Sequence, residues 1–251
     1  MKATIGSMRP IDLAVDETVA FILANIGTPP LRILDVGCGN GLVAQRLQAR
    51  GYHITAIDES DDLVGQARAS GVDARVADWS SYADEPFDVI LFARSLHHIH
   101  PLSGAVTQAY QLLVPSGRLI VEDFAWDEID PITAEWFYGI VKLLDRCQVL
   151  VSKVHSFASE LARSDGKLEF WQQSHDPGLH TVTAMWSELH AQFRPLSETS
   201  APYLYSYLYP VLPENGSGYA IIAQVLDMEQ RLAQSGAITL IGRRFVGVKQ
   251  R

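Results

Sequence analysis

The sequence predicts a single α/β domain built around one mostly parallel sheet with helices on both faces. Two observations lead to this prediction. Short apolar runs that end near glycine or aspartate alternate with helix-like segments from residue 32 to residue 124, and a helix and a strand follow at 218–249. Strands that alternate with helices indicate βαβ units, whose strands are parallel and whose crossovers are right-handed.

The first helix is expected at residues 10–26, because apolar residues recur there at helical spacing between Pro10 and Gly27. The alternation that follows predicts strands at 32–36, 53–58, 74–79, 87–93 and 118–124, with helices at 42–51, 61–71 and 102–117. The last of these helices is expected to end at Pro115 and Gly117, which are residues typical of helix ends.

The regular alternation stops after Phe124. Residues 127–190 have a mostly helical pattern with many aromatic side chains, residues 193–208 look strand-like, and a helix at 218–236 precedes a strand at 243–249. We therefore expect one domain over residues 1–251, whose parts are an N-terminal helix (1–28), a cofactor-binding core (29–125), a helical lid insertion (126–190) and the last two strands with their intervening helix (191–251).

The composition argues against several classes of protein. The formal net charge is -9, whereas affinity for nucleic acid comes mainly from clustered Lys and Arg. There are two cysteines, too few for a disulfide scaffold or a cysteine-based zinc site. No apolar run approaches the roughly 20 residues that span a bilayer, and the start of the chain does not resemble a signal peptide. We expect a cytoplasmic protein with no nucleic-acid or membrane partner.

A glycine-rich loop follows the first strand. Gly37, Gly39 and Gly41 lie between this strand and the next helix, where glycine allows sharp turns and a close approach of the backbone to a ligand. Leu42 occupies the position at which a dinucleotide fingerprint needs its third glycine, which disfavours a nicotinamide-dependent dehydrogenase. No Gly-Lys-Ser/Thr follows either, so the loop is not a Walker motif.

Acidic residues stand at the ends of the first three strands. Asp35 beside the glycine loop repels a pyrophosphate but suits a cationic ligand or one with ammonium donors. Asp58 can accept hydrogen bonds from both hydroxyls of a ribose, and Asp78 can accept one from an exocyclic amine. Trp79 offers a flat apolar face, although simple packing is an alternative. Together these residues indicate a pocket for an adenosine that carries a short charged tail and no phosphates.

In these motifs the chain resembles the class I S-adenosylmethionine-dependent methyltransferases. The resemblance rests on "ILDVGCGNG" (33–41), "AIDES" (56–60), "ADW" (77–79), "FDVILFARSLHHIH" (87–100) and "LLVPSGRLIVED" (112–123), which occur in the family's order and spacing.

The resemblance implies a Rossmann-like seven-stranded sheet with six parallel strands and an antiparallel last strand. It also implies S-adenosylmethionine as the cofactor. The expected cofactor-binding residues are Asp35, Gly37, Gly39 and Gly41 at the methionine part, Asp58 at the ribose, Asp78 and Trp79 at the adenine, and Ala93 at the end of the fourth strand.

The stretch "SLHHIH" contains three of the chain's eight histidines. Neighbouring side chains point to different sides, so His97 and His98 do not easily converge on one metal ion, and we expect no metal site. We assign His98 a structural role in the turn before the next helix. His97 is the candidate catalytic base, because a neutral imidazole can accept a proton near pH 7.

The methyl acceptor is expected to be a small, partly apolar metabolite. "FARS" after the fourth strand (92–95) lacks the Asn/Asp-Pro-Pro-Tyr/Phe pattern of amino-group methylation and the Pro-Cys pair of attack on a pyrimidine ring. An aromatic lid suits a small molecule. We name Arg94, His175 and Tyr203 as candidate substrate contacts and His180 as a second catalytic candidate.

For the aromatic residues of this part, a packed core is an equal alternative. The tyrosines at 203, 205, 207 and 209 would share one face of a strand. Glu122 and Asp123 are further acid or base candidates, or caps of the following helix.

Methyl transfer to an oxygen, nitrogen or carbon nucleophile is the expected activity (EC 2.1.1.-). Two alternatives from other classes stay open, namely a protein of this fold with cyclase or lyase chemistry, and a non-catalytic partner subunit. A homodimer is left open as well. The sequence does not indicate which acceptor atom receives the methyl group.

Overall fold

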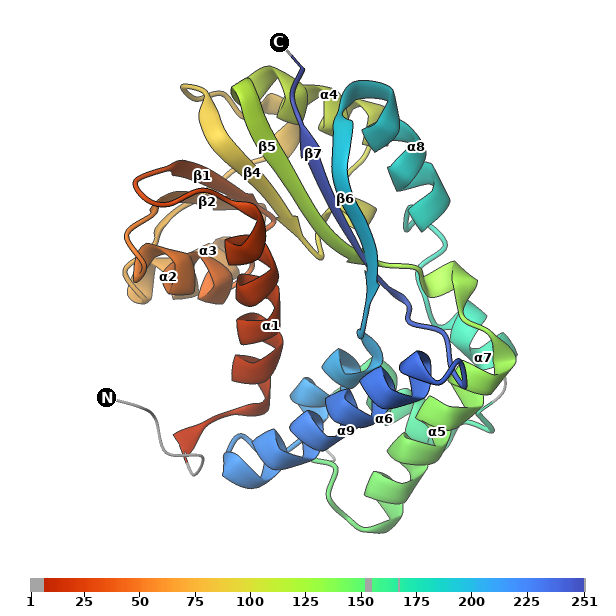
Figure 1. Cartoon of the computed structure of the whole chain (residues 1–251). Helices are drawn as coiled ribbons and strands as arrows, with labels where there is room; N and C mark the ends of the chain where they lie inside the picture. Colours follow the sequence, from red (N-terminus) through yellow and green to blue (C-terminus); the bar gives the residue numbers. More distant parts are fainter. Residues whose placement is uncertain (1–6, 152–154, 167, 251) are drawn as a thin grey trace. The chain divides into compact units, whose positions relative to one another are not determined.

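Seven strands form one sheet within residues 7–151, 155–166 and 168–250, the part of the chain that this computed structural model describes. The order is β3-β2-β1-β4-β5-β7-β6 (Figure 1). The strands are β1 Arg32–Val36, β2 His53–Asp58, β3 Asp73–Val76, β4 Phe87–Ala93, β5 Leu113–Phe124, β6 Arg194–Ala201 and β7 Gly242–Val248. Strands β1 to β5 pair in parallel, and β7 runs antiparallel to β5. The expected Rossmann-like sheet with an antiparallel last strand is confirmed.

The helices of the described residues are α1 Pro10–Asn25, α2 Leu42–Gln48, α3 Asp61–Ala69, α4 Leu102–Leu112, α5 Pro131–Arg146, α6 Phe157–Arg163, α7 Leu168–Gln173, α8 Val182–Gln192 and α9 Gly216–Gln234. Short 3₁₀ helices are η2 Trp79–Ser81, η3 Leu96–His98, η4 Trp126–Glu128 and η5 Leu204–Val211.

The chain forms two compact units. The sheet unit comprises Glu17–Phe124, Gly178–Thr199 and the chain from Arg243 onward. The helical unit comprises the start of the chain to Asp16, Ala125–Pro177 and Ser200–Gly242. The boundary between Pro177 and Gly178 falls inside the segment 126–190, which the sequence presented as one insertion.

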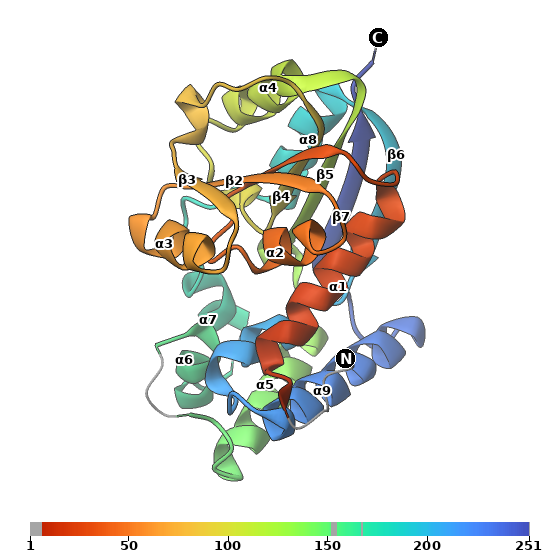
Figure 2. The ribbon, with the colours of Figure 1, turned by 90° about the vertical axis from the view of Figure 1, so that its left-hand side faces the viewer.

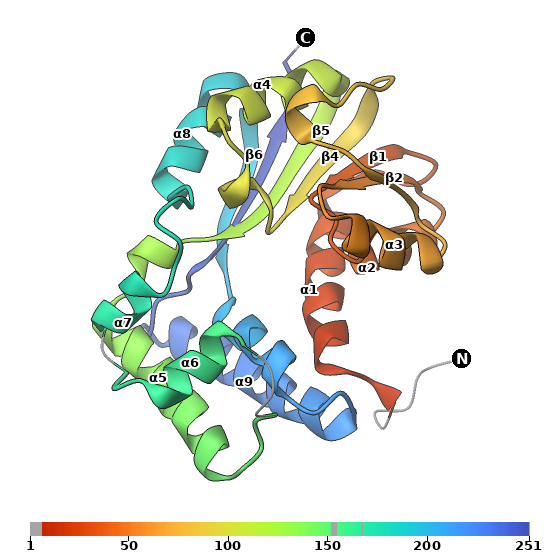
Figure 3. The ribbon, with the colours of Figure 1, turned by 180° about the vertical axis from the view of Figure 1, so that it is seen from behind.

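Helices cover both faces of the sheet. Helices α2 and α3 lie on one face, and α4 and α8 lie on the other (Figure 2). Helices α4 and α8 pack against each other (Figure 3), and Gln192 Nε2 on α8 donates to Thr107 Oγ1 on α4 at 2.8 Å. Because both faces are covered, the central strands are apolar along nearly their whole length, and Ile33, Leu34 and Ile90 are fully buried.

The pairing register brings the carboxyl ends of the central strands to one edge. Val36 at the end of β1 pairs with Ile57 on β2 and with Phe92 on β4. Ala93, the last residue of β4, pairs with Glu122 near the end of β5. The loops that follow β1, β2 and β4 therefore start side by side, which is the usual ligand-binding edge of such a sheet.

Several expected element boundaries are wrong. Strand β3 ends at Val76 instead of residue 79, and Asp78 caps the 3₁₀ helix η2 that begins at Trp79. Helix α4 ends at Leu112, and β5 begins at Leu113, so the expected helix end at residues 115–117 is incorrect. Phe87 pairs with Leu113 and Val89 pairs with Arg118, and the extra residues between them form an irregularity in β5. Proline is tolerated there because the ladder of hydrogen bonds is interrupted.

The strand-like reading of residues 193–208 is correct only for its first part. Strand β6 ends at Ala201, and the 3₁₀ helix η5 follows. The tyrosines therefore do not share one face of a strand. Tyr203 and Tyr207 contact each other across one turn instead, with ring centroids 5.6 Å apart.

An aromatic core holds the helical unit together. Phe157 of α6 contacts Trp171 of α7 at a centroid distance of 4.7 Å and Tyr207 of η5 at the same distance. Phe137 of α5 completes this cluster and is fully buried. Edge-to-face contacts such as that between Phe157 and Trp171 each stabilise by about 1 kcal/mol beyond the burial of area.

Candidate functional site

A cavity of about 340 Å³ opens at the carboxyl edge of the sheet unit. It is lined by Val36, Gly37, Ile57, Asp58, Glu59, Ala77, Asp78, Trp79, Arg94, Ser95, His98, Ile99 and His100. Five residues selected from the sequence thus lie around one space, and they are Gly37, Asp58, Asp78, Trp79 and Arg94. Sequence reasoning missed Glu59, Ser95, Ile99 and His100, although each lies next to a residue or motif that had been selected.

The glycine loop turns sharply after β1. Gly37 has a φ of 71°, and its amide donates to the Ile57 carbonyl at 2.9 Å. A Cβ on Gly37 would lie 2.5 Å from the Cβ of Ser95. A Cβ on Gly41 would lie 2.7 Å from the Cβ of Ala67 on α3. Gly37 therefore permits close approach at the cavity wall, whereas Gly41 permits close packing against α3.

The carboxylate of Asp35 is buried without a polar partner among the described residues. Its side chain is 1% exposed, and neither carboxylate oxygen has a hydrogen-bond partner among the described residues. Burial, followed by the negative charge of Asp58, raises the pKa of Asp35 to about 7. A buried carboxylate without a partner is costly, so a cationic or hydrogen-bond-donating ligand beside it would be stabilised.

Asp58 is held in place by backbone amides. Gly39 N donates to Asp58 Oδ2 at 2.9 Å, and Ser60 N donates to Oδ1 at 2.9 Å. Each carboxylate oxygen keeps lone pairs for a further donor. Two hydroxyl groups on neighbouring carbons of a ligand could therefore bind this carboxylate.

Asp78 and Trp79 form another wall of the cavity. Asp78 is exposed, and its carboxylate accepts from the backbone and side chain of Ser80, both at 2.8 Å. Trp79 is 3% exposed, and its Nε1 donates to the Ala105 carbonyl at 3.2 Å. Trp79 thus packs in the core and lines the cavity at once, so packing and ligand contact do not exclude each other.

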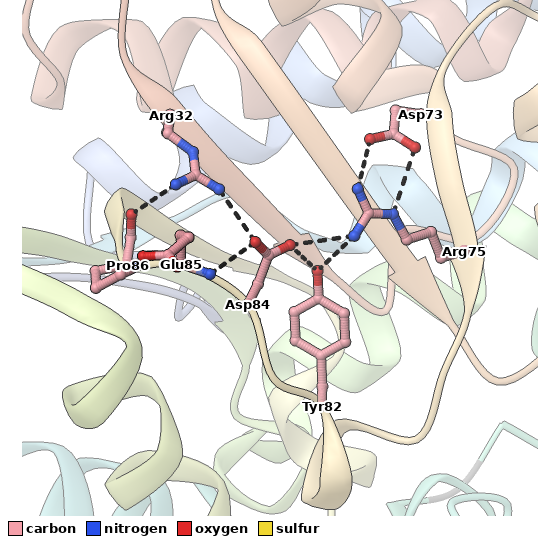
Figure 4. A network of polar contacts seen from close by, with 7 residues as sticks. All are labelled: Arg32, Asp73, Arg75, Tyr82, Asp84, Glu85 and Pro86. Carbon is pink, nitrogen blue, oxygen red and sulfur yellow. Dashed lines mark hydrogen bonds and ion pairs between the residues drawn. The ribbon is translucent and has the colours of Figure 1, made fainter.

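A polar network fixes the loop that follows Trp79 (Figure 4). Asp84 accepts from Arg32 Nη2 at 3.2 Å, from Arg75 Nη1 at 3.1 Å and from the Tyr82 hydroxyl at 2.8 Å. Burial and the bond to Asp84 raise the pKa of Tyr82 to about 12. Tyr82 is therefore a neutral donor near pH 7. Its ring stacks on Trp79 at a centroid distance of 6.4 Å, so the network stabilises this wall of the cavity.

His97 is buried beside an aspartate. Its side chain is 5% exposed, and Nδ1 lies 2.7 Å from Oδ1 of Asp123, which is fully buried. The ring N–H is not aligned on this oxygen, so the contact is an ion-pair geometry rather than a good hydrogen bond. Asp123 Oδ2 also accepts from the His97 amide at 3.3 Å. His97 does not line the cavity, whereas His98, expected to be structural, does.

Arg94 has a φ of 62°, a conformation that is strained for a residue with a side chain. Its amide donates to the Glu122 carbonyl at 2.7 Å, next to Ala93 at the end of β4.

The Glu122 carboxylate accepts from Arg244 on β7 at 2.7 Å and from the Thr18 hydroxyl on α1. Glu122 thus joins three elements. The cap of the next helix, α5, is Asp130, so neither acid that was considered for this role provides it.

The remaining candidates lie in different units. His180 belongs to the sheet unit, whereas His175 and Tyr203 belong to the helical unit. His175 Nδ1 lies 2.8 Å from the Trp171 carbonyl, and its Nε2 lies 2.9 Å from the Tyr207 hydroxyl. The Nδ1–H tautomer satisfies both contacts, with Tyr207 as the donor to Nε2. The Tyr203 amide donates to Glu229 at 2.7 Å.

Within the described residues, no group of three or more His, Cys, Asp or Glu side chains could hold a metal ion. None of the helices in that part of the chain is both long and apolar enough to cross a membrane.

A family model described as a methyltransferase domain matches residues 10–181, which is more than half of the chain. The chain therefore belongs to this methyltransferase family. The resemblance to S-adenosylmethionine-dependent methyltransferases is confirmed, and S-adenosylmethionine is the cofactor of these proteins.

Individual relatives agree with this assignment. The chain is 32% identical over 125 residues to a ubiquinone biosynthesis O-methyltransferase of Xylella fastidiosa, covering 46% of this chain and 51% of that protein. It is 26% identical over 186 residues to the protein of the same name from Alkalilimnicola ehrlichii, covering 70% and 72%. The chain thus spans about half the length of the first of these relatives.

A solved S-adenosylmethionine-dependent methyltransferase of Mesorhizobium loti has a similar fold. Its TM-score is 0.58 at 15% identity, covering 94% of this chain and 100% of the other.

Proposed function

We propose that this protein transfers a methyl group from S-adenosylmethionine to a small organic molecule and that the cofactor binds in the cavity at the carboxyl edge of the sheet. The observation that supports this most is the buried, unpartnered carboxylate of Asp35, which does not itself line the cavity but directly precedes Val36, which does. A carboxylate in this position is stabilised by the positively charged methionine end of the cofactor, and no phosphate-bearing cofactor would suit it.

The residues that line the cavity match the remaining parts of the cofactor. Asp58, with both oxygens oriented by backbone amides, would accept the ribose hydroxyls. Asp78 and Trp79 would border the adenine, and Gly37 lets the methionine part pass close to the backbone. Bound there, S-adenosylmethionine supplies an activated methyl group on a sulfonium, and the protein contributes alignment and exclusion of water.

We further propose that His97 takes a proton from a hydroxyl acceptor and that Asp123 is its positioning residue. A carboxylate at 2.7 Å from Nδ1 favours the Nδ1–H tautomer, which leaves Nε2 as the proton-accepting atom. Catalytic hydrogen bonds are often poorly aligned before the substrate binds, which agrees with the geometry at Nδ1. The O-methyltransferase names of the relatives support an oxygen nucleophile.

Further parts of the proposal concern the acceptor contacts, the location in the cell and the oligomeric state. We propose that Arg94, which lines the cavity, contacts the acceptor. We also propose a cytoplasmic location. Size-exclusion chromatography with light scattering tests whether the protein is a homodimer.

The experiment has a binding arm and a turnover arm. Calorimetry should show S-adenosylmethionine binding that Asp58→Ala weakens by roughly 1.5–3 kcal/mol, the scale of a lost hydrogen bond to a charged group. Incubation with the cofactor and a metabolite extract should release S-adenosylhomocysteine. His97→Gln and Asp123→Asn should lower kcat with little change in cofactor affinity.

Unchanged cofactor affinity in Asp58→Ala would contradict the placement of the ribose. Binding without any S-adenosylhomocysteine across acceptor pools would favour the cyclase, lyase or partner-subunit alternatives. Full turnover in His97→Gln would exclude His97 as the base.

A further inference from the structure

Two short segments of the sheet unit are fastened to each other at the cavity. The first is the lip, residues 97–100, of which His98, Ile99 and His100 line the cavity. The second is the strap, residues 178–180, which directly precedes Thr181, the N-cap of α8. The strap is also where the chain enters the sheet unit from the helical unit.

Three hydrogen bonds join the strap to the lip. The His180 amide donates to the His97 carbonyl at 2.9 Å. His180 Nε2 lies 3.0 Å from the Ile99 carbonyl, and His100 Nε2 lies 2.9 Å from the Gly178 carbonyl. Because both acceptors are carbonyls, each imidazole must carry its proton on Nε2. Two of the three bonds therefore depend on histidine side chains.

The two imidazoles face each other closely. The ring centroids of His100 and His180 are 4.1 Å apart, with an interplanar angle of 49°. Two neutral rings pack well at this distance, whereas two imidazolium rings would repel each other. The other titratable groups that act on His180 are His97, which adds to the repulsion, and the buried Asp123, which opposes it.

We propose that His180 is a positioning residue for the cofactor cavity rather than a catalytic residue. In its neutral form it holds the lip in place, and protonation of the partly buried His180 weakens this hold and, with it, the binding of S-adenosylmethionine. The inference rests on the proposed function, because it requires the cofactor to occupy this cavity.

The direction of the pH effect follows from the packing of His180. Burial is the largest cause and lowers its pKa below the ordinary 6.5; the hydrogen bond to the Ile99 carbonyl opposes this shift, and the proximity of His100 adds to it, so that the net direction is downward. The state in which the strap is hydrogen-bonded to the lip thus binds fewer protons than the state in which these bonds are broken. The bonded state is fully populated above about pH 6.5 and is lost as the pH falls below that value.

Calorimetry of S-adenosylmethionine binding from pH 8 to pH 5.5 tests this proposal. His180→Gln keeps an amide donor for the Ile99 carbonyl but cannot be protonated, so its affinity at pH 8 should stay near that of the wild type. Between pH 8 and pH 5.5 the wild type should lose more affinity than His180→Gln does, because only the wild type carries the titrating imidazole at this position. Titration of Asp35 contributes equally to both proteins and cancels in this comparison.

Two further variants make the result specific. His180→Ala should bind more weakly than His180→Gln at every pH, because it lacks the donor. His190→Gln is the matched control, since His190 lies on α8 of the same unit and pairs at an exposed position with Glu198 at 2.7 Å. This control should reproduce the wild-type pH curve.

Identical pH curves for the wild type and His180→Gln, with normal affinity at pH 8, would overturn the role of His180 but leave the proposed function intact. Equal affinity of His180→Ala and the wild type at pH 8 would overturn it as well. A wild-type protein that fails to bind S-adenosylmethionine at pH 8 would overturn the proposed function together with this inference.

Discussion

Replacement of Gly37 by alanine should destabilise the protein more than the same replacement at Gly39, although both glycines have positive φ. The angles are 71° at Gly37 and 55° at Gly39. A side chain in this left-handed conformation costs roughly 1–2 kcal/mol at either position. At Gly39 the new methyl group would meet no atom within 4 Å, whereas at Gly37 it would lie 2.5 Å from the Cβ of Ser95.

The overlap at Gly37 cannot be relieved by a rotamer change, because the Cβ of Ser95 is fixed to the backbone. Overpacking of this kind typically adds about 1–3 kcal/mol. We therefore expect Gly37→Ala to lower the free energy of unfolding by about 2–5 kcal/mol and Gly39→Ala by about 1–2 kcal/mol. Urea titrations followed by circular dichroism measure both values.

A second variant isolates the contact with Ser95. Ser95→Gly removes the blocking Cβ, at the cost of the hydrogen bond from Ser95 Oγ to the Val36 carbonyl at 2.6 Å. In the double variant Gly37→Ala/Ser95→Gly, the destabilisation should be smaller than the sum of the two single effects by about 1–3 kcal/mol. Equal effects of alanine at the two glycines, or strictly additive effects in the double variant, would refute this reasoning.

Two other predictions concern buried acids. Burial raises the pKa of Glu229 to about 7 from its usual 4.5, so the folded protein retains a proton that the unfolded chain loses. Stability should therefore fall by roughly 3 kcal/mol between about pH 4.5 and pH 7 and stay level above, and Glu229→Gln should flatten this part of the stability curve. Arg244→Met should cost about 3 kcal/mol, because it leaves the carboxylate of Glu122, which is 11% exposed, without its cation. Thermal unfolding measures this loss; Glu122→Met in the same chain should restore much of it, and Arg231→Met, at an exposed pair, should change stability by less than about 0.5 kcal/mol. A large effect at Arg231 or no recovery in the double variant would contradict this account.

The part of the fold that local patterns determine could be predicted from the sequence. Buried parallel strands are apolar along most of their length, so β1, β2 and β4 were located to the residue. The cavity wall at Gly37 and Asp58 follows from the same logic, because Gly37 directly follows β1 and Asp58 closes β2, and the ends of these strands must meet at one edge. Asp78 lies beyond the end of β3, where it caps η2.

Features that depend on tertiary pairing were not accessible. The start of β5 at Leu113 is set by the irregular pairing with β4, whereas the local sequence continues a helical pattern up to Pro115. The turn at Tyr203 is held by Glu229, whose carboxylate accepts three backbone N–H groups from residues 203–205. Likewise, nothing in the adjacent residues of "LHHIH" shows that Asp123 lies beside His97 or that His180 holds Ile99.

The position of β7 has a consequence for how the sheet assembles. This strand comes last in the sequence of strands, yet it lies between β5 and β6. During synthesis β6 therefore emerges before the neighbour that joins it to the sheet, and one edge of β5 stays open in the meantime. The carboxylate of Glu122 also lacks its ion-pair partner until β7, which contains Arg244, has been synthesised. Pairings of such long sequence separation form slowly and expose strand edges, so the sheet unit closes late, and partly synthesised chains are the form most prone to aggregate.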